Sequence, residues 1–281
     1  MIVMVAETGG FCMGVALALR KLDTMVEQGG TDIFTLGPII HNPQVLQDYE
    51  RLGVRIAKSP EDIPSGAAVI IRAHGIPREV QQELKAKDVT LVDATCPKVK
   101  KAQLLIAEQT DKGRRLLLFG EEDHPEVKGL VSYAGESPLV FGDLEELMAT
   151  DLPPEVEYFL AAQTTQDKET FSLISDHLHE RLGQGLPVLA TICDATKERQ
   201  EEAVAIAREV DAMVVAGGFS SGNTRRLVDV VRAQGTQCYH VETVDQIPTQ
   251  ALCDVAAVGL TAGASTPKMI IDDICAKLQS L

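Results

Sequence analysis

The sequence predicts an α/β protein made of three similar units, each with a small, mostly parallel sheet. Along the 281 residues, short β-rich apolar runs alternate with longer stretches of helical period. This alternation is typical of parallel sheets covered by helices. A coarser repeat accompanies it, because Cys12, Cys96 and Cys193 stand 84 and 97 positions apart, each in a loop between a strand and a helix. An internal repeat of this kind bears on the architecture before any single motif does.

The expected strands are apolar runs that end in a polar loop. In chain order they are Ile2–Ala6, Ile33–Leu36, Ala67–Ile71, Thr90–Val92, Arg115–Phe119, Tyr158–Ala162, Val188–Ile192, Ala212–Ala216, Cys238–Val241 and Val255–Leu260. The expected helices lie between these runs and carry apolar residues at helical spacing. The clearest are Val15–Val26, Pro77–Lys87, Lys98–Gln109, Lys168–Leu182, Glu198–Val210, Thr224–Gln234 and Pro267–Leu278.

The repeat places the unit boundaries near the three cysteines. A second polar loop follows each cysteine 28 or 29 positions later, at His41, His124 and Ser221. The expected units are residues 1–95, 96–192 and 193–281, with no Gly/Ser-rich or Pro-rich linker between them. Ligand loops in open α/β sheets lie at the carboxyl ends of the strands. Three such units could therefore converge on one centre with approximate threefold symmetry.

The amino-acid composition argues against some classes of function. The formal net charge is −15 and there is no tryptophan, which argues against nucleic acid as a partner. No apolar run approaches the ~18–20 residues of a membrane span, and the first residues lack the pattern of a signal peptide. We therefore expect a cytoplasmic protein with a small-molecule substrate and no membrane or nucleic-acid partner. An anionic substrate would need a locally favourable site on so acidic a chain.

The three repeated cysteines admit three interpretations. They are buried thiols, a zinc site with three thiolates, or the ligands of an iron–sulfur cluster. A [4Fe–4S] cluster usually takes four cysteines, so three would leave one iron without a protein ligand, free to act as a Lewis acid. The remaining cysteines lie outside the repeat and are interpreted as core or incidental thiols; they are Cys238, Cys253 and Cys275.

The other polar loop residues are chemically consistent with an anion site. Imidazoles, hydroxyls, an amide and free N–H groups at helix N-termini together suit a phosphate or diphosphate. The candidates are His41, His74, His124, Ser221, Asn223 and Ser265. Taken singly, the serines and the asparagine are better explained as helix N-caps. The set as a whole favours the anion site.

Glu126 and Thr164 are candidates for proton transfer. Glu126 follows His124 by two residues, at the start of an expected helix. From the sequence alone, the better explanation of Glu126 is a first-turn acid that stabilises the helix. Thr164 either relays a proton or orients water, or it caps the expected helix Lys168–Leu182.

At this point the chain resembles a known family, the 4-hydroxy-3-methylbut-2-enyl diphosphate reductases (LytB/IspH). The resemblance runs in order from about residue 9 to residue 267 and depends on short motifs. They are Gly10–Val15 (GFCMGV), Gly37–Asn42 (GPIIHN), Arg72–Gly75 (RAHG), Asp93–Pro97 (DATCP), Gly120–Gly129 around His124-Pro125-Glu126, Gln163–Thr165 (QTT), Cys193–Thr196 (CDAT) and Thr261–Ser265 (TAGAS). The resemblance implies the trefoil fold and reductive removal of the substrate's allylic hydroxyl, giving isopentenyl and dimethylallyl diphosphate.

The resemblance also implies roles for single residues. Cys12, Cys96 and Cys193 would hold a [4Fe–4S] cluster with one iron lacking a protein ligand. The diphosphate would be bound by His41, His74, His124, Ser221, Asn223 and Ser265. Glu126 would deliver protons, with Thr164 and His124 beside it, and electrons would come from a ferredoxin or flavodoxin. One departure is Gly222, where the family usually has serine or alanine. The competing hypotheses are an iron–sulfur hydro-lyase and a non-enzymatic zinc or thiol redox module.

Overall fold

The computed structural model describes residues 1–29 and 32–281. Its strands are β1 (Ile2–Val5), β2 (Ile33–Leu36), β3 (Arg55–Ala57), β4 (Ala68–Ile71), β5 (Thr90–Asp93), β6 (Arg115–Phe119), β7 (Leu139–Phe141), β8 (Tyr158–Ala162), β9 (Ala212–Ala216), β10 (Gln237–Val241) and β11 (Ala257–Ala262). Its α-helices are α1 (Met13–Glu27), α2 (Pro43–Arg51), α3 (Arg78–Ala86), α4 (Pro97–Asp111), α5 (Pro125–Val131), α6 (Leu144–Ala149), α7 (Lys168–Leu182), α8 (Asp194–Ala207), α9 (Gly222–Arg232), α10 (Thr249–Leu252) and α11 (Lys268–Gln279). Short 3₁₀ turns are η1 (Pro60–Asp62) and η2 (Val244–Gln246).

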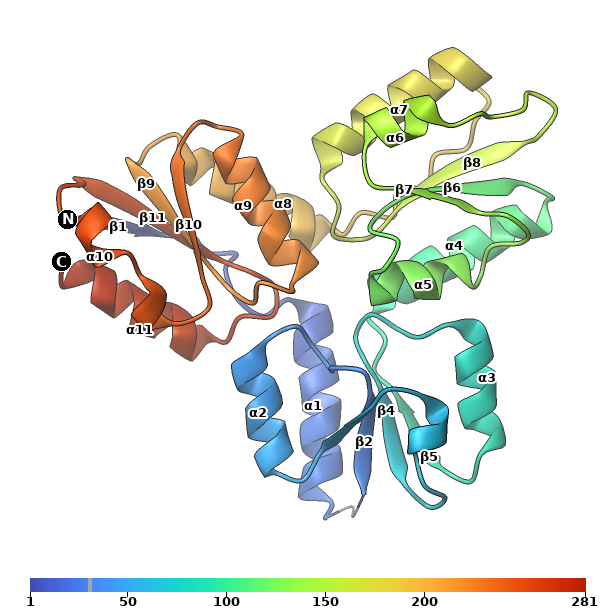
Figure 1. Ribbon diagram of the computed structural model, residues 1–281, viewed down its shortest axis with the longest axis horizontal. Helices are drawn as coiled ribbons and strands as arrows, with labels where there is room; N and C mark the ends of the chain where they lie inside the picture. The colour runs from blue at the N-terminus through green and yellow to red at the C-terminus, as the bar shows by residue number, and fades with distance from the viewer. Residues whose placement is uncertain (30–31) are drawn as a thin grey trace. The chain divides into compact units, whose positions relative to one another are not determined.

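These elements form three small sheets, in which every described strand pairing is parallel (Figure 1). The predicted α/β class with three small parallel sheets is confirmed. By contacts the chain divides into two compact units. Unit 1 contains residues 1–16, 40–51 and 194–281, and unit 2 contains residues 17–39 and 52–193.

Sheet A lies in unit 1 and has the strand order β1-β11-β9-β10. Successive side chains of β9 point to opposite faces, as the period of a strand requires. Ala212, Val214 and Ala216 pack into a core with Ile270 and Ile274 of α11. Alternate residues of β9 pack into a second core with α8 and α9. Both faces are therefore covered, which explains the continuous apolar character of this strand.

Sheets B and C lie in unit 2. Sheet B has the order β3-β2-β4-β5. Its core includes Val69 and Ile71 of β4 and Leu84 of α3. Sheet C has the order β7-β6-β8. One of its faces packs against α6 and α7, and the other against α4 and α5. Because every sheet is parallel, the loops after its strands meet at one edge, which is where the predicted site residues lie.

The first strand joins the last sheet. Strand β1 pairs with β11, with Ile2 opposite Ala257 and Val5 opposite Leu260. Figure 1 shows the blue β1 beside the strands of sheet A. The division into residues 1–95, 96–192 and 193–281 stays a prediction, but β1 does not share a sheet with β2–β5. Hydrophobic pattern identifies a strand and says little about which neighbour it will pair with.

Some short elements were missed or overestimated. Strands β3 and β7 have three residues each, too short for a clear alternation. The apolar stretch Val188–Ile192 is not a strand and makes only an isolated bridge between Val188 and Leu160. Among the described residues, none of the helices has both the length and the apolar character needed to cross a membrane.

Candidate functional site

In unit 1, the loop that carries Cys12 is held by the loop after β11. The Cys12 N–H donates to the Ala264 carbonyl oxygen at 3.1 Å. In turn, the Ala264 N–H donates to Asn223 Oδ1 at 2.9 Å. Cys12 Sγ accepts from the Val15 N–H at 3.5 Å, in the first turn of α1. Three loops from one edge of sheet A are thus joined by hydrogen bonds.

Three of the predicted anion ligands gather at this same edge. Ser221, Asn223 and Ser265 are each at least 94% buried. Ser221 is the N-cap of α9, since its Oγ accepts from the Thr224 N–H at 3.3 Å. Ser265 Oγ donates to the His41 carbonyl oxygen at 3.1 Å, which brings the His41 loop to the group. The capping explanation therefore holds for Ser221, and the other two side chains have different partners.

The Asn223 amide carries an unused donor. Its Nδ2 is buried and makes no hydrogen bond within residues 1–29 and 32–281. Leaving a buried polar group unpaired costs about 1–3 kcal/mol. Gly222 and Asn223 also open α9, and the first N–H groups of a helix have no partner inside it. Unpaired donors at a helix N-terminus fit an anionic ligand.

Two charged residues of α8 that the sequence reasoning missed fix the backbone before Cys12. Arg199 of α8 donates to the Thr8 carbonyl oxygen at 2.7 Å and to the Gly10 carbonyl oxygen at 3.1 Å. Glu202 accepts from the N–H groups of Glu7 and Thr8, both at 2.8 Å. The signal was an Arg and a Glu three residues apart on a helix face, which in most helices is a solvated pair.

In unit 2, Glu126 in the first turn of α5 and Thr164 in the loop after β8 form a buried pair. Glu126 is 1% exposed. Its Oε1 accepts from the Thr164 N–H at 2.6 Å, and its Oε2 accepts from Thr164 Oγ1 at 3.0 Å. Burial raises the pKa of Glu126 to about 7, although the two hydrogen bonds from Thr164 act in the opposite direction. Glu126 is therefore an acid poised to exchange a proton near neutral pH.

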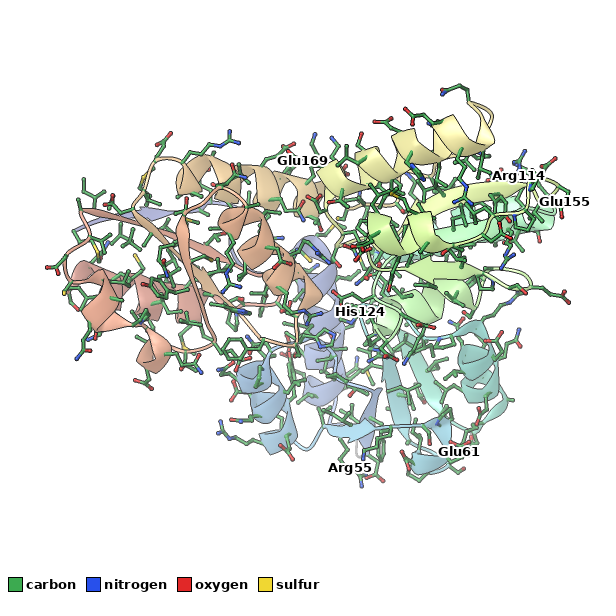
Figure 2. The ribbon with its side chains drawn as sticks, turned by 45° about the horizontal axis from the view of Figure 1, so that its top comes forward. Arg55, Glu61, Arg114, His124, Glu155 and Glu169 are labelled. Carbon is green, nitrogen blue, oxygen red and sulfur yellow. The ribbon has the colours of Figure 1, made fainter. Side chains whose placement is uncertain are left out.

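His124 precedes this pair and is oriented by it. His124 is the N-cap of α5, and its Nδ1 accepts from the Glu126 N–H at 3.1 Å. A nitrogen that accepts a hydrogen bond carries no proton, so the neutral ring has its proton on Nε2. The ring packs edge-on against His74, with 5.3 Å between the ring centroids. Figure 2 shows His124 at the opposite end of sheet C from Arg114 and Glu155.

Backbone hydrogen bonds tie the two cysteines of unit 2 to these residues. The Cys193 N–H donates to the Thr164 carbonyl oxygen at 3.0 Å. The Cys96 N–H donates to the Ala73 carbonyl oxygen at 2.9 Å, one residue before His74. Hydrogen bonds thus join Cys193 to the group of Thr164, Glu126 and His124. The Cys96 loop is joined to the His74 loop, and the contact between the His74 and His124 rings links the two sets.

The repeated cysteines fit a cluster better than the other three do. Cys12, Cys96 and Cys193 are half-buried and form no disulfide with a described residue, and each directly precedes a helix. The positive end of a helix favours an anionic ligand such as a thiolate. By contrast, Cys238 packs in the core behind sheet A, where burial raises the pKa of its thiol to about 11. Cys253 is exposed, and Cys275 packs at the edge of a core.

Gln163 is a second residue whose role the sequence reasoning missed. Its side chain is 1% exposed and joins the loops after β6 and β8. Oε1 accepts from the Glu121 N–H at 3.0 Å, and Nε2 donates to Thr165 Oγ1 at 3.2 Å. These bonds keep the His124 loop in register with the Thr164 loop. Its place in the QTT motif was the available signal.

The fold and these loops define a class of α/β protein with three parallel sheets, cysteines before helices and a buried acid. The chain belongs to the LytB family, whose model, described as LytB protein, matches residues 3–279. A protein of Oleidesulfovibrio alaskensis named 4-hydroxy-3-methylbut-2-enyl diphosphate reductase is 62% identical over 276 residues, 98% of each chain. A protein of Geobacter sulfurreducens with the same name is 42% identical over 277 residues, 99% of this chain and 96% of its own.

Solved structures agree. The E-1-hydroxy-2-methyl-but-2-enyl-4-diphosphate reductase of Plasmodium falciparum matches with a TM-score of 0.93 at 26% identity, covering 98% of this chain and 87% of its own. An (E)-4-hydroxy-3-methyl-but-2-enyl diphosphate reductase, titled the terminal enzyme of the non-mevalonate pathway, matches with a TM-score of 0.70 at 36% identity over the whole of both chains. The resemblance found in the sequence motifs is confirmed.

Proposed function

We propose that this chain is a 4-hydroxy-3-methylbut-2-enyl diphosphate reductase of non-mevalonate isoprenoid biosynthesis. It converts its substrate to isopentenyl and dimethylallyl diphosphate. The reaction breaks the allylic C–O bond, consumes two electrons and two protons, and releases water. The observation that carries the proposal, beside family membership, is Glu126: a buried carboxyl with a pKa of about 7, beside an imidazole and a hydroxyl.

The proposed cofactor is a [4Fe–4S] cluster with one iron that lacks a protein ligand. Cys12, Cys96 and Cys193 would hold it, since they are half-buried thiols that each stand directly before a helix. When bound, the cluster supplies electrons and a Lewis acid for the substrate's hydroxyl. The first-turn N–H groups of the following helices stabilise the negative charge of the three thiolates.

The proposed diphosphate ligands are the six polar side chains that the motifs single out, His41, His74, His124, Ser221, Asn223 and Ser265. The free Asn223 Nδ2 and the α9 N-terminus support this role in unit 1. At Gly222, where the family has a hydroxyl or methyl side chain, the backbone N–H of the helix start takes the place of the missing contact. In unit 2, His124 would donate from Nε2, because Nδ1 is held by Glu126.

The proton for the departing hydroxyl comes from Glu126 in this proposal. Below pH 7 the side chain is neutral and donates. The Thr164 N–H and hydroxyl hold the two oxygens, so the donating geometry is fixed before the substrate arrives. Thr164 then orients the substrate's hydroxyl, and both residues keep bulk water from the transferred proton. A ferredoxin or flavodoxin supplies the electrons, and the cytoplasm is the proposed location.

Anaerobic purification tests the cofactor and the reaction separately. We expect brown protein with about four irons per chain and reduction of the substrate by chemically reduced methyl viologen. Cys96→Ser is expected to lose both iron and activity, whereas the core variant Cys238→Ser keeps both. A colourless zinc protein would overturn the cluster, and turnover without any electron donor would favour the hydro-lyase.

A further inference from the structure

A basic, partly apolar surface surrounds the starts of two helices in unit 2. We call it the α3–α4 surface and define it as Arg78, Lys100, Lys101, Leu104 and Tyr133. The three cations are exposed, and Leu104 is 69% exposed. Lys100, Leu104 and Tyr133 line a cavity of about 190 Å³. Arg78 adjoins its rim, since the Arg78 N–H donates to Ser132 Oγ, one residue before Tyr133.

Folding does not account for these cations. Arg78 is the first residue of α3, and Lys100 and Lys101 lie in the first five residues of α4. Cations near a helix N-terminus oppose the macrodipole. For Lys100 this unfavourable interaction is partly offset by an ion pair with Asp93, in which Nζ lies 2.6 Å from Oδ2. Lys101 forms no ion pair with another described residue.

The net charge of the whole chain indicates which kind of partner the α3–α4 surface would bind. At −15, the chain repels other acidic macromolecules. A partner that is itself acidic can approach only where positive charge is concentrated, since complementary charge governs both encounter rate and orientation. Leu104 and Tyr133 supply the apolar centre that such a contact needs, surrounded by a charged rim.

The surface starts next to a predicted cluster ligand. Cys96 is the N-cap of α4, and Lys101 follows it by five residues. At 1.5 Å per residue, this places Lys101 about 8 Å further along the helix axis. Leu104 continues the same solvent face, because residues three and four apart lie one above the other.

We propose that the α3–α4 surface docks the electron donor, an acidic one-electron carrier protein. This inference is a consequence of the proposed function, which needs an external donor. Two successive dockings deliver the two electrons of one turnover. Each carrier leaves oxidised by one electron, and the substrate gains both electrons as its C–O bond breaks.

The test compares two reductants on the same holoenzyme. Reduced methyl viologen needs no protein contact, whereas an acidic flavodoxin kept in its reduced state does. For Arg78→Glu/Lys101→Glu, we expect the flavodoxin-driven rate at low salt to fall about tenfold or more. The viologen-driven rate is expected to stay within about twofold. Because both substitutions put an acid at a helix N-terminus, the variant gains rather than loses helix stability.

The matched control reverses the same charges at the other ends of the same helices. Lys85→Glu/Lys112→Glu is expected to keep the flavodoxin-driven rate within about twofold. An unchanged flavodoxin-driven rate in Arg78→Glu/Lys101→Glu, or an equal fall in the control, would overturn the docking surface. If the viologen-driven rate of the Glu variant falls as well, the milder variant Arg78→Gln/Lys101→Gln is used. A ratio of its flavodoxin-driven to its viologen-driven rate that equals the wild-type ratio would then overturn the docking surface. Wild-type protein inactive with viologen would instead refute the proposed function.

Discussion

The titration of Glu126 gives the sharpest test of the chemistry. Its carboxyl has a pKa of about 7, against an ordinary value of 4.5. At that value the side chain is about 90% protonated at pH 6, half protonated at pH 7 and about 10% protonated at pH 8. If the neutral acid delivers the proton, kcat/KM falls about tenfold for each pH unit well above 7.

The assay is viologen-driven turnover from pH 5.5 to 9 under anaerobic conditions. Reduced methyl viologen is the suitable donor, because its own reduction involves no proton. Glu126→Gln is the control, since an amide of the same shape keeps partners at Thr164 but does not titrate. Its rate should be at least about a hundredfold lower than that of the wild type.

The ratio of the two profiles isolates Glu126. Ionisation of the substrate's diphosphate affects both proteins equally and cancels in this ratio. A ratio that stays constant between pH 6 and pH 9 would refute the assignment of Glu126 as the acid. A ratio that already falls about tenfold per pH unit from pH 5.5 upward would show instead that burial does not perturb its pKa.

The same residue also makes stability depend on pH. The pKa of Glu126 is raised on folding, so its favourable contribution is present below pH 4.5 and is lost as the pH rises through 7. Urea unfolding should therefore find Glu126→Gln more stable than wild type by about 3 kcal/mol at pH 8, with little difference near pH 4.5. Thr164→Val removes one hydrogen bond that lowers this pKa, and the alkaline limb of the rate profile should move up by as much as about one pH unit. In Gly218→Ala, the new Cβ would meet the His41 carbonyl oxygen at 2.6 Å. We expect KM for the substrate to rise about tenfold or more, whereas Gly185→Ala, where a Cβ meets nothing within 4 Å, should leave KM unchanged.

Much of the fold was accessible from the sequence because it depends on local pattern. The five residues of β9 and the five of β8 are completely buried, and their apolar runs were evident. Helix α7 was expected from the apolar spacing of Lys168–Leu182, but its N-cap is Asp167 and not the suggested Thr164. The pairing of β1 with β11 was not accessible, since Ile2–Val5 would look the same beside any parallel neighbour.

The sequence also determined the chemical types at the candidate site. Glycine-lined turns, the cysteine repeat and the ordered motifs between about residues 9 and 267 named the thiols, the imidazoles and the family. The tertiary structure decided the burial and the hydrogen-bond partners of each group, and with them its pKa. On sequence alone, Glu126 was best explained as an ordinary helix-start acid. Burial against Thr164 changed that, because desolvation by distant parts of the chain raises the pKa of a carboxyl to about 7.

Arg199 and Gln163 illustrate the same limit. Each is an unremarkable polar residue in the sequence, yet each is nearly fully buried and holds a loop of the candidate site. Their partners are distant in the chain or belong to another loop, and no local pattern records such a partner. Local sequence sets which atoms are present and where helices begin. Long-range packing sets which of those atoms lose water and gain a hydrogen bond, and that is what makes them functional.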